Sequence, residues 1–203
     1  MSKTRSKVRS KPASKGGLPR NLSRYLTTER IIVGGILILI LAAVIFVIAS
    51  QAPPPPAIDL SIADNSEAIP IMGREHIAVN QAHPPYNSNP PTSGPHYSNA
   101  FSPARAGVYT EILADETVIH NLEHGHVWFS YSDDDDQEAI DLLSEIQASF
   151  PREVIVTLRP QTPSRVAAAA WGRLLTVDGE LNRDELQAFI QRYRNRAPER
   201  VPG

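Results

Sequence analysis

The chain has 203 residues, 18 of them proline and none cysteine, which excludes disulfide bonds, thiolate metal ligands and a cysteine nucleophile. Its formal net charge of −2 is unevenly spread, with +8 in residues 1–30 and −10 in the rest. No lysine occurs after Lys15, and an acidic domain without a basic patch is not expected to bind nucleic acid.

An uncharged apolar run occupies residues 31–50. At about 1.5 Å per residue, a helix of this length crosses the roughly 30 Å hydrocarbon core of a bilayer. The Lys and Arg residues of the preceding tail, residues 1–30, favour a cytoplasmic N-terminus. The prediction is a single-pass protein of the cell membrane, in which the lipid bilayer is the partner of the N-terminal helix and the C-terminal domain is extracytoplasmic.

The alternative is a cleaved secretory signal, with Val47 and Ala49 as the small residues before the cut. The long basic region and the long apolar run favour an anchor over such a signal. Residues 51–57 contain four consecutive prolines and are expected to form an extended spacer. Residues 58–203 then form one exported domain.

The first part of this domain, residues 58–103, is rich in Pro, Asn, Ser and Gly and has no sustained periodicity, so loops over a core are expected. Strand-like composition begins further on. Two such segments, residues 116–120 and 126–131, can pair as a hairpin, or a short turn can bend one into the other. Residues 154–158 predict a buried strand, and 166–171 with 174–177 predict one or two more.

Two main helices are predicted. Ser132 is the expected N-cap of the first, with Asp133–Asp136 in its first turn and Pro151 ending it. Asn182 is the expected N-cap of the second, with Glu185 at the capping-box position. The expected inner faces are Ile140, Leu143, Ile146 and Phe150 in the first, and Leu186, Phe189, Ile190 and Tyr193 in the second. The fold class is therefore α+β, with helices on a small mixed sheet.

The histidines are clustered in a quarter of the chain. All six lie between residues 76 and 126, at His76, His83, His96, His120, His124 and His126. Imidazole nitrogens suit Zn²⁺ and Cu²⁺, which three or four nitrogen or carboxylate ligands can hold without thiolates. The alternative is that these rings are hydrogen-bonded struts that satisfy backbone groups in a loop-rich segment.

His120, Glu123 and His124 also match H-x-x-E-H, the inverted zinc-peptidase pattern, in which both histidines face one metal from a helix. The segment before this motif is strand-like and Gly125 follows it, so the sequence does not predict the helix that peptidase chemistry needs. Ser93 lacks the context of a nucleophile elbow, and a rigid turn presenting His96 is expected there. Asp133–Asp136 lacks the spacing of a calcium loop.

Several motifs resemble the bacterial family known as domain of unknown function 3105. They are YNSNPPTSGPHY from Tyr86 to Tyr97, VIHNLEHG from Val118 to Gly125, GREH from Gly73 to His76, AWG from Ala170 to Gly172, and FIQRYRN. The resemblance implies a membrane-anchored or exported envelope protein of unassigned function. It singles out His76, His96, His120, Glu123 and His124, whereas His126 stands where the family usually has glycine.

The leading hypothesis is an envelope-facing domain that binds copper or zinc through His96, His120 and His124, with His76 or Glu123 completing the ligand set. Handling or sensing of metal is favoured over catalytic turnover. The alternatives are a metal-free module that binds another envelope protein or cell-wall material, and a metal-dependent hydrolase.

Overall fold

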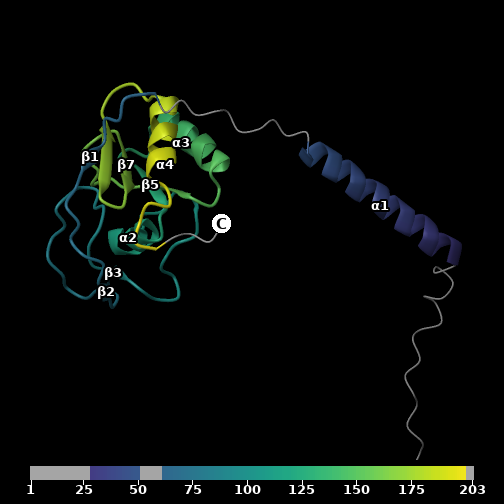
Figure 1. Ribbon diagram of the computed structural model, residues 1–203, viewed down its shortest axis with the longest axis horizontal. Helices are drawn as coiled ribbons and strands as arrows, with labels where there is room; N and C mark the ends of the chain where they lie inside the picture. The colour runs from purple at the N-terminus through teal and green to yellow at the C-terminus, as the bar shows by residue number, and fades with distance from the viewer. Residues whose placement is uncertain (1–27, 51–60, 200–203) are drawn as a thin grey trace, which may run out of the picture. The chain divides into compact units, whose positions relative to one another are not determined.

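A computed structural model describes residues 28–50 and 61–199 (Figure 1). By its internal contacts the chain divides into two compact units, residues 1–54 and 55–203, and each is described by itself. Of the predicted cytoplasmic tail only residues 28–30 are described. The predicted spacer, residues 51–57, lies outside the described residues.

The first unit contains one helix, α1, from Thr28 to Ser50, which includes the whole apolar run. Its side chains are described at residue 30 and at residues 32–44. Among the residues described, no helix combines the length and the apolar character needed to cross a membrane. The predicted transmembrane span is therefore not confirmed.

The second unit is built on a six-stranded mixed sheet with the strand order β1-β8-β7-β5-β6-β4. The strands β4, β5 and β6 are parallel to one another, while β7 is antiparallel to β5 and β8, and β1 is antiparallel to β8. The α+β class and the mixed sheet are confirmed. The strands are β1 (Glu67–Ala68), β4 (Gly107–Tyr109), β5 (Val127–Tyr131), β6 (Val154–Leu158), β7 (Val166–Ala170) and β8 (Arg173–Val177).

Three helices accompany this sheet: α2 (Asp115–Glu123), α3 (Gln137–Ser149) and α4 (Arg183–Tyr193). The cap of α4 is as predicted, because the Asn182 side chain accepts hydrogen bonds from the backbone N–H groups of Asp184 and Glu185. The cap of α3 is Asp136 and not Ser132, since the Asp136 carboxylate accepts from the backbone N–H of Ala139. The acidic residues before Asp136 form a turn that precedes the helix.

The strand predicted at residues 116–120 is wrong, because this segment lies inside α2. The β-branched residues Thr117, Val118 and Ile119 suggest a strand, yet Asp115 and Glu116 in the first turn favour a helix through the helix dipole. Val118 and Leu122, four residues apart, are both fully buried in one apolar cluster. Packing of this helical face therefore overrides the local β propensity.

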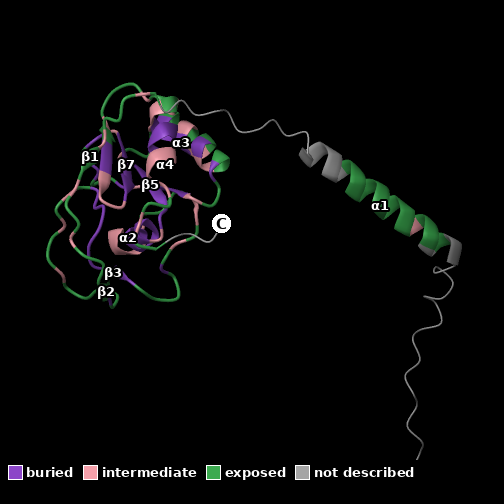
Figure 2. Ribbon diagram, in the orientation of Figure 1, coloured by how far each residue is buried: buried purple, intermediate pink, exposed green. Residues whose placement is uncertain are grey.

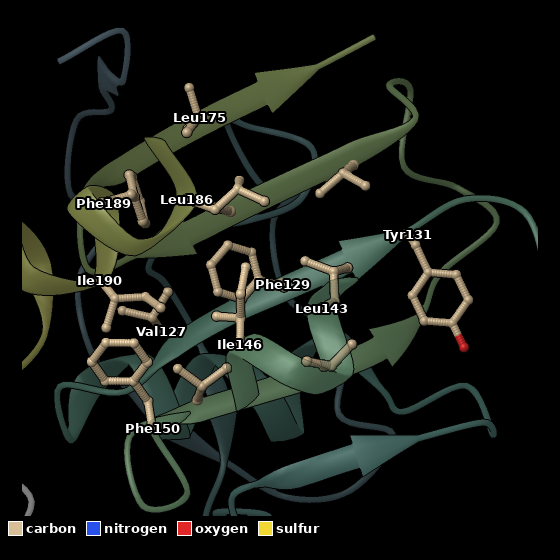
Figure 3. Close-up of a cluster of buried hydrophobic side chains, with 14 of the residues drawn as sticks. Val127, Phe129, Tyr131, Leu143, Ile146, Phe150, Leu175, Leu186, Phe189 and Ile190 are labelled. Atoms are coloured by element: carbon tan, nitrogen blue, oxygen red, sulfur yellow. The ribbon is translucent and has the colours of Figure 1, made fainter. Parts of the chain in front are cut away.

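Both faces of the central strands are buried, and the alternation along β5 divides its side chains between them. Val127, Phe129 and Tyr131 belong to one apolar cluster with residues of α3 and α4. Figure 3 shows Leu143 and Ile146 beside Phe129 in this cluster. Trp128 points to the other face and joins a second cluster with residues of α2. Figure 2 accordingly shows the central strands as buried.

The proline-rich segment is mostly loop, as predicted, but it contains a second small sheet. Its strands are β2 (His76–Ile77) and β3 (His96–Tyr97), which pair in parallel so that His76 lies opposite His96. The strand β3 also packs against α2. This contact brings the histidines of the loops to the histidines of the helix.

Candidate metal centre

Four of the predicted site residues come together. They are His76 on β2, His96 on β3, and His120 and Glu123 on α2, and we call them the His–Glu cluster. Each offers one ligand atom, and these four atoms all lie within 4.8 Å of one another. The cluster can therefore hold a metal ion. Its members come from three segments that are separate in the sequence.

The three rings of the cluster are almost equally spaced. Their centroids lie 4.9 Å apart for His76 and His96, 5.1 Å for His76 and His120, and 5.0 Å for His96 and His120. The Glu123 carboxylate completes the arrangement. Its Oε2 lies 2.9 Å from Nε2 of His96 and 3.4 Å from Nε2 of His76. Ligand atoms about 2.0–2.1 Å from one zinc ion lie roughly 3.4 Å apart in a tetrahedral site. The separation of Oε2 of Glu123 and Nε2 of His76 agrees with this spacing.

Backbone carbonyls fix the two buried rings. Nδ1 of His96 donates to the Gly94 carbonyl at 2.8 Å, and Nδ1 of His120 donates to the Tyr97 carbonyl at 2.6 Å. Because a carbonyl only accepts, Nδ1 of each ring carries a proton, and Nε2 of a neutral ring carries the lone pair. Nε2 of His96 also makes a hydrogen bond of 2.9 Å with Oε2 of Glu123, and a bound ion would replace this bond. The hydrogen bonds to the carbonyls give the tautomer and orientation that a metal-ligating histidine needs.

The turn before His96 depends on Gly94, which adopts a φ of +121°. A Cβ atom at this position would lie 3.0 Å from Cε1 of Tyr86, so both the conformation and the space favour glycine. The hydroxyl of Ser93 accepts a hydrogen bond from the backbone N–H of Met72 at 3.0 Å and ties this turn to the segment that carries His76. The turn thus connects the segments that carry His76 on β2 and His96 on β3.

On α2 the three-residue spacing of His120 and Glu123 places both side chains on one face of the helix. The neighbouring Asn121 is fully buried and exchanges two hydrogen bonds with the backbone of Ala104, at 2.7 and 2.9 Å. These bonds attach the loop at Ala104 to α2. Ser102 in the same loop places its hydroxyl 3.3 Å from Nδ1 of His120.

Burial lowers the pKa of His120 from its ordinary value, and the neighbouring His96, His124 and His76 act in the same direction. The hydrogen bond to Tyr97 opposes this shift without reversing it. A lowered pKa keeps the imidazole neutral near neutral pH, which is the form that binds a metal.

Three histidines lie outside the cluster. The ring of His124 stacks on that of His120 at 4.9 Å, and its Nδ1 lies 3.3 Å from a carboxylate oxygen of Glu199. His83 contacts Glu116 at 3.1 Å. His126 is buried, and its Nδ1 donates to the Asn121 carbonyl at 3.1 Å. The structure therefore does not place His124 among the convergent ligand atoms.

The H-x-x-E-H motif does lie on a helix, contrary to the prediction, but its residues do not take the peptidase roles. In that pattern both histidines face one ion and the glutamate acts on water. Here Glu123 offers a ligand atom beside His120, while His124, the residue after α2, contacts Glu199. The geometry thus differs from that of the peptidase signature.

A second group of possible ligands, formed by Asp133, Asp134 and Asp135, is fully exposed. Its neighbour Asp136 caps α3 and forms an ion pair with Arg165 at 2.6 Å. An exposed acidic turn before a helix is accounted for by capping and solvation.

The turn predicted before His96 is present, with Gly94 at a φ of +121°. Sequence reasoning did not identify Tyr97, Ser102 and Asn121, which hold the other side chains of the His–Glu cluster in place. Tyr97 acts through its backbone carbonyl, which no side-chain pattern reveals. Gly94 and Asn121 do lie next to the predicted ligands, within SGPH and HNLEHG. A glycine two residues before a histidine was the available signal of a special turn.

The family model described as "Protein of unknown function (DUF3105)" matches residues 76–202. The chain belongs to this family. The matched range begins at His76 and includes the whole His–Glu cluster. No curated protein and no solved structure matches the chain.

Proposed function

We propose that the C-terminal domain of this DUF3105 protein binds one transition metal ion, copper or zinc, through the His–Glu cluster. One observation carries the proposal: three imidazoles and a carboxylate from three separate segments converge on one point. The two buried imidazoles also have their Nδ1 protons committed to carbonyls, so Nε2 is the nitrogen through which each neutral ring can bind the ion.

The donor atoms support these two metals. Three nitrogen ligands and one oxygen ligand suit borderline ions such as Zn²⁺ and Cu²⁺, whereas Cu⁺ prefers sulfur ligands. Mg²⁺ and Ca²⁺ prefer sets made only of oxygen. The function that follows is handling or sensing of a transition metal.

In the metal-free alternative the Glu123 side chain, only 2% exposed, has one hydrogen bond with Nε2 of His96 at 2.9 Å and a contact with Nε2 of His76 at 3.4 Å. A carboxylate removed from water is costly unless a positive charge or several hydrogen bonds compensate it. A divalent cation supplies that charge at the point where the imidazole nitrogens also converge.

The test is the metal content of the full-length chain, purified in detergent and incubated with one equivalent of Zn²⁺ or Cu²⁺. We expect near-stoichiometric binding by the natural protein and loss of most of it in His96→Ala and His120→Ala. His83→Ala is the matched control, since its ring contacts Glu116 outside the cluster. Equal metal content in all four proteins would refute the proposal and favour the metal-free interaction module.

We further propose that the domain is anchored in the cell membrane through residues 31–50, with the N-terminus in the cytoplasm. The uncharged apolar run and the basic tail before it support this. The protein should stay with the membrane fraction in alkaline carbonate, and deletion of residues 1–50 should release it. Recovery of the full-length chain in the carbonate-soluble fraction would show that the anchor is absent.

A further inference from the structure

The four members of the His–Glu cluster are buried to very different degrees. The side chains of His96 and Glu123 are 0% and 2% exposed, and His120 is 6% exposed as a residue. In contrast, the side chain of His76 is 48% exposed. The cluster therefore reaches solvent at His76.

The rings also differ in how firmly they are held. His96 and His120 are each fixed through Nδ1 by a carbonyl, and His120 has the Ser102 hydroxyl nearby as well. For His76, the described part of the chain provides a 3.4 Å contact with Glu123, an edge-on contact with the ring of His96 and a tilted contact with the ring of His120. Rotation of the His76 side chain thus breaks no backbone hydrogen bond.

The backbone under His76 is nevertheless well fixed. The Glu75 carbonyl accepts from the backbone N–H of His96 at 2.9 Å, and the Gly73 carbonyl accepts from that of Gly94 at 3.1 Å. The next residue, Ile77, is buried. The ring of His76 can therefore move away and return by rotation of its side chain alone, without displacement of β2.

The three buried ligands form a sufficient set without His76. Two imidazoles and one carboxylate hold zinc or iron in many sites that leave one or more positions open for water or another ligand. Loss of the His76 nitrogen would change a closed shell into an open one and leave the ion bound.

We propose that His76 is the exchange ligand of this centre: His96, His120 and Glu123 retain the ion, and departure of His76 opens the position through which metal is loaded and released. The inference rests on the proposed metal binding. It implies that the bound ion is exchangeable. The ligands that deliver or remove it would approach from the solvent at β2.

The experiment compares zinc release from the full-length chain, its His76→Ala variant and its His96→Ala variant in detergent. Each protein is loaded with Zn²⁺ and mixed with an excess of a chromophoric chelator. We expect His76→Ala to keep near-stoichiometric zinc but to release it at least about tenfold faster, because even residues that only support a metal ligand change affinity by that factor. His96→Ala should lose most of the bound zinc, because the remaining set then depends on His76, whose side chain is 48% exposed and is held by no backbone carbonyl among the described residues.

Free imidazole provides a second measurement that a merely structural role would not affect. In His76→Ala it can enter from solvent at the vacated position, so millimolar imidazole should slow zinc release towards the natural rate. No such rescue is expected for His96→Ala, whose position is closed to solvent. A circular dichroism spectrum of each variant checks that it is folded.

The outcomes separate the two proposals. If the natural protein binds no zinc, the proposed function fails. If it binds zinc and His76→Ala loses it as completely as His96→Ala does, His76 is an ordinary retaining ligand and the exchange role is wrong. An unchanged release rate without any effect of imidazole would show that His76 is not a ligand.

Discussion

At the residue scale, the histidines of this domain fall into two electrostatic groups. Burial lowers the pKa of His126, as it does for His120. In contrast, the hydrogen bond that the His83 ring donates to the Glu116 carboxylate raises the pKa of His83 above its ordinary value of 6.5. These opposite shifts predict opposite effects of pH on the free energy of unfolding.

For His126 the folded protein binds the proton less tightly than the unfolded chain does. Its contribution to stability is therefore complete above about pH 6.5 and is lost as the pH falls below that value. We expect His126→Gln to flatten the acid side of the stability profile between about pH 6.5 and 5. Urea unfolding of the full-length chain, with a chelator present to exclude metal, measures this effect.

His83→Gln is the matched control with the opposite sign. A raised folded pKa stabilises the protein at low pH, and this contribution disappears as the pH rises through the folded value. The variant should therefore lose stability mainly below about pH 6.5. Parallel profiles for both variants and the natural protein would contradict the assignment of these shifts.

Residue types and spacing were sufficient to suggest a histidine site, and the structure brings four of the five named positions together. His124 was included because it follows Glu123 in the motif. Its ligand atom is not among the four that converge. His124 directly follows α2, and its Nδ1 contacts Glu199 in the C-terminal segment. Such a contact between distant parts of the chain could not be deduced from local spacing.

At the element scale, α2 covers the segment that was wrongly predicted as a strand, and it carries two members of the His–Glu cluster. Three consecutive β-branched residues, Thr117 to Ile119, suggested a strand. The helix is stabilised by burial against the sheet, which depends on tertiary contacts. The strands β5 and β6 were predictable from their β-branched and aromatic composition, and the helices α3 and α4 from an apolar periodicity that extends over the whole element.

The end of α2 depends on Gly125, which has a φ of +86°. A Cβ atom there would lie 2.8 Å from Cα of Asn195, whose backbone N–H donates to the Gly125 carbonyl. We expect Gly125→Ala to lower the free energy of unfolding by about 1–3 kcal/mol or more, as for a residue forced into an unfavourable conformation.

Gly179→Ala is the control for this change, because no atom lies within 4 Å of the added Cβ and its φ is not in the left-handed region. It should leave stability unchanged within about 0.5 kcal/mol. Chemical denaturation of the two variants side by side measures the difference. Similar midpoints would show that the contact between Gly125 and Asn195 is unimportant.

At the scale of the whole molecule, the sheet separates two apolar clusters with different relations to the site. Leu143 of α3 lies in the cluster on one face, and Leu122 of α2 lies in the cluster on the other. Both side chains are fully buried. Only Leu122 belongs to the helix that carries His120 and Glu123.

Leu122→Ala and Leu143→Ala should each reduce stability by about 2–5 kcal/mol, because both leave a cavity in a packed core. We expect only Leu122→Ala also to weaken zinc binding, by about 10- to 100-fold, since it loosens the support of the ligands. Denaturation curves and chelator competition measure the two effects. Equal weakening of zinc binding in both variants would show that the site does not depend on α2 in particular.

The four convergent side chains have one more consequence for a chain that contains no cysteine. An ion held by His76, His96 and His120 would tie together stretches of polypeptide that are 20 and 24 positions apart. Closing such loops restricts the unfolded chain, as a disulfide does. The ion would therefore act as a cross-link that reductants cannot cleave and that chelators can remove.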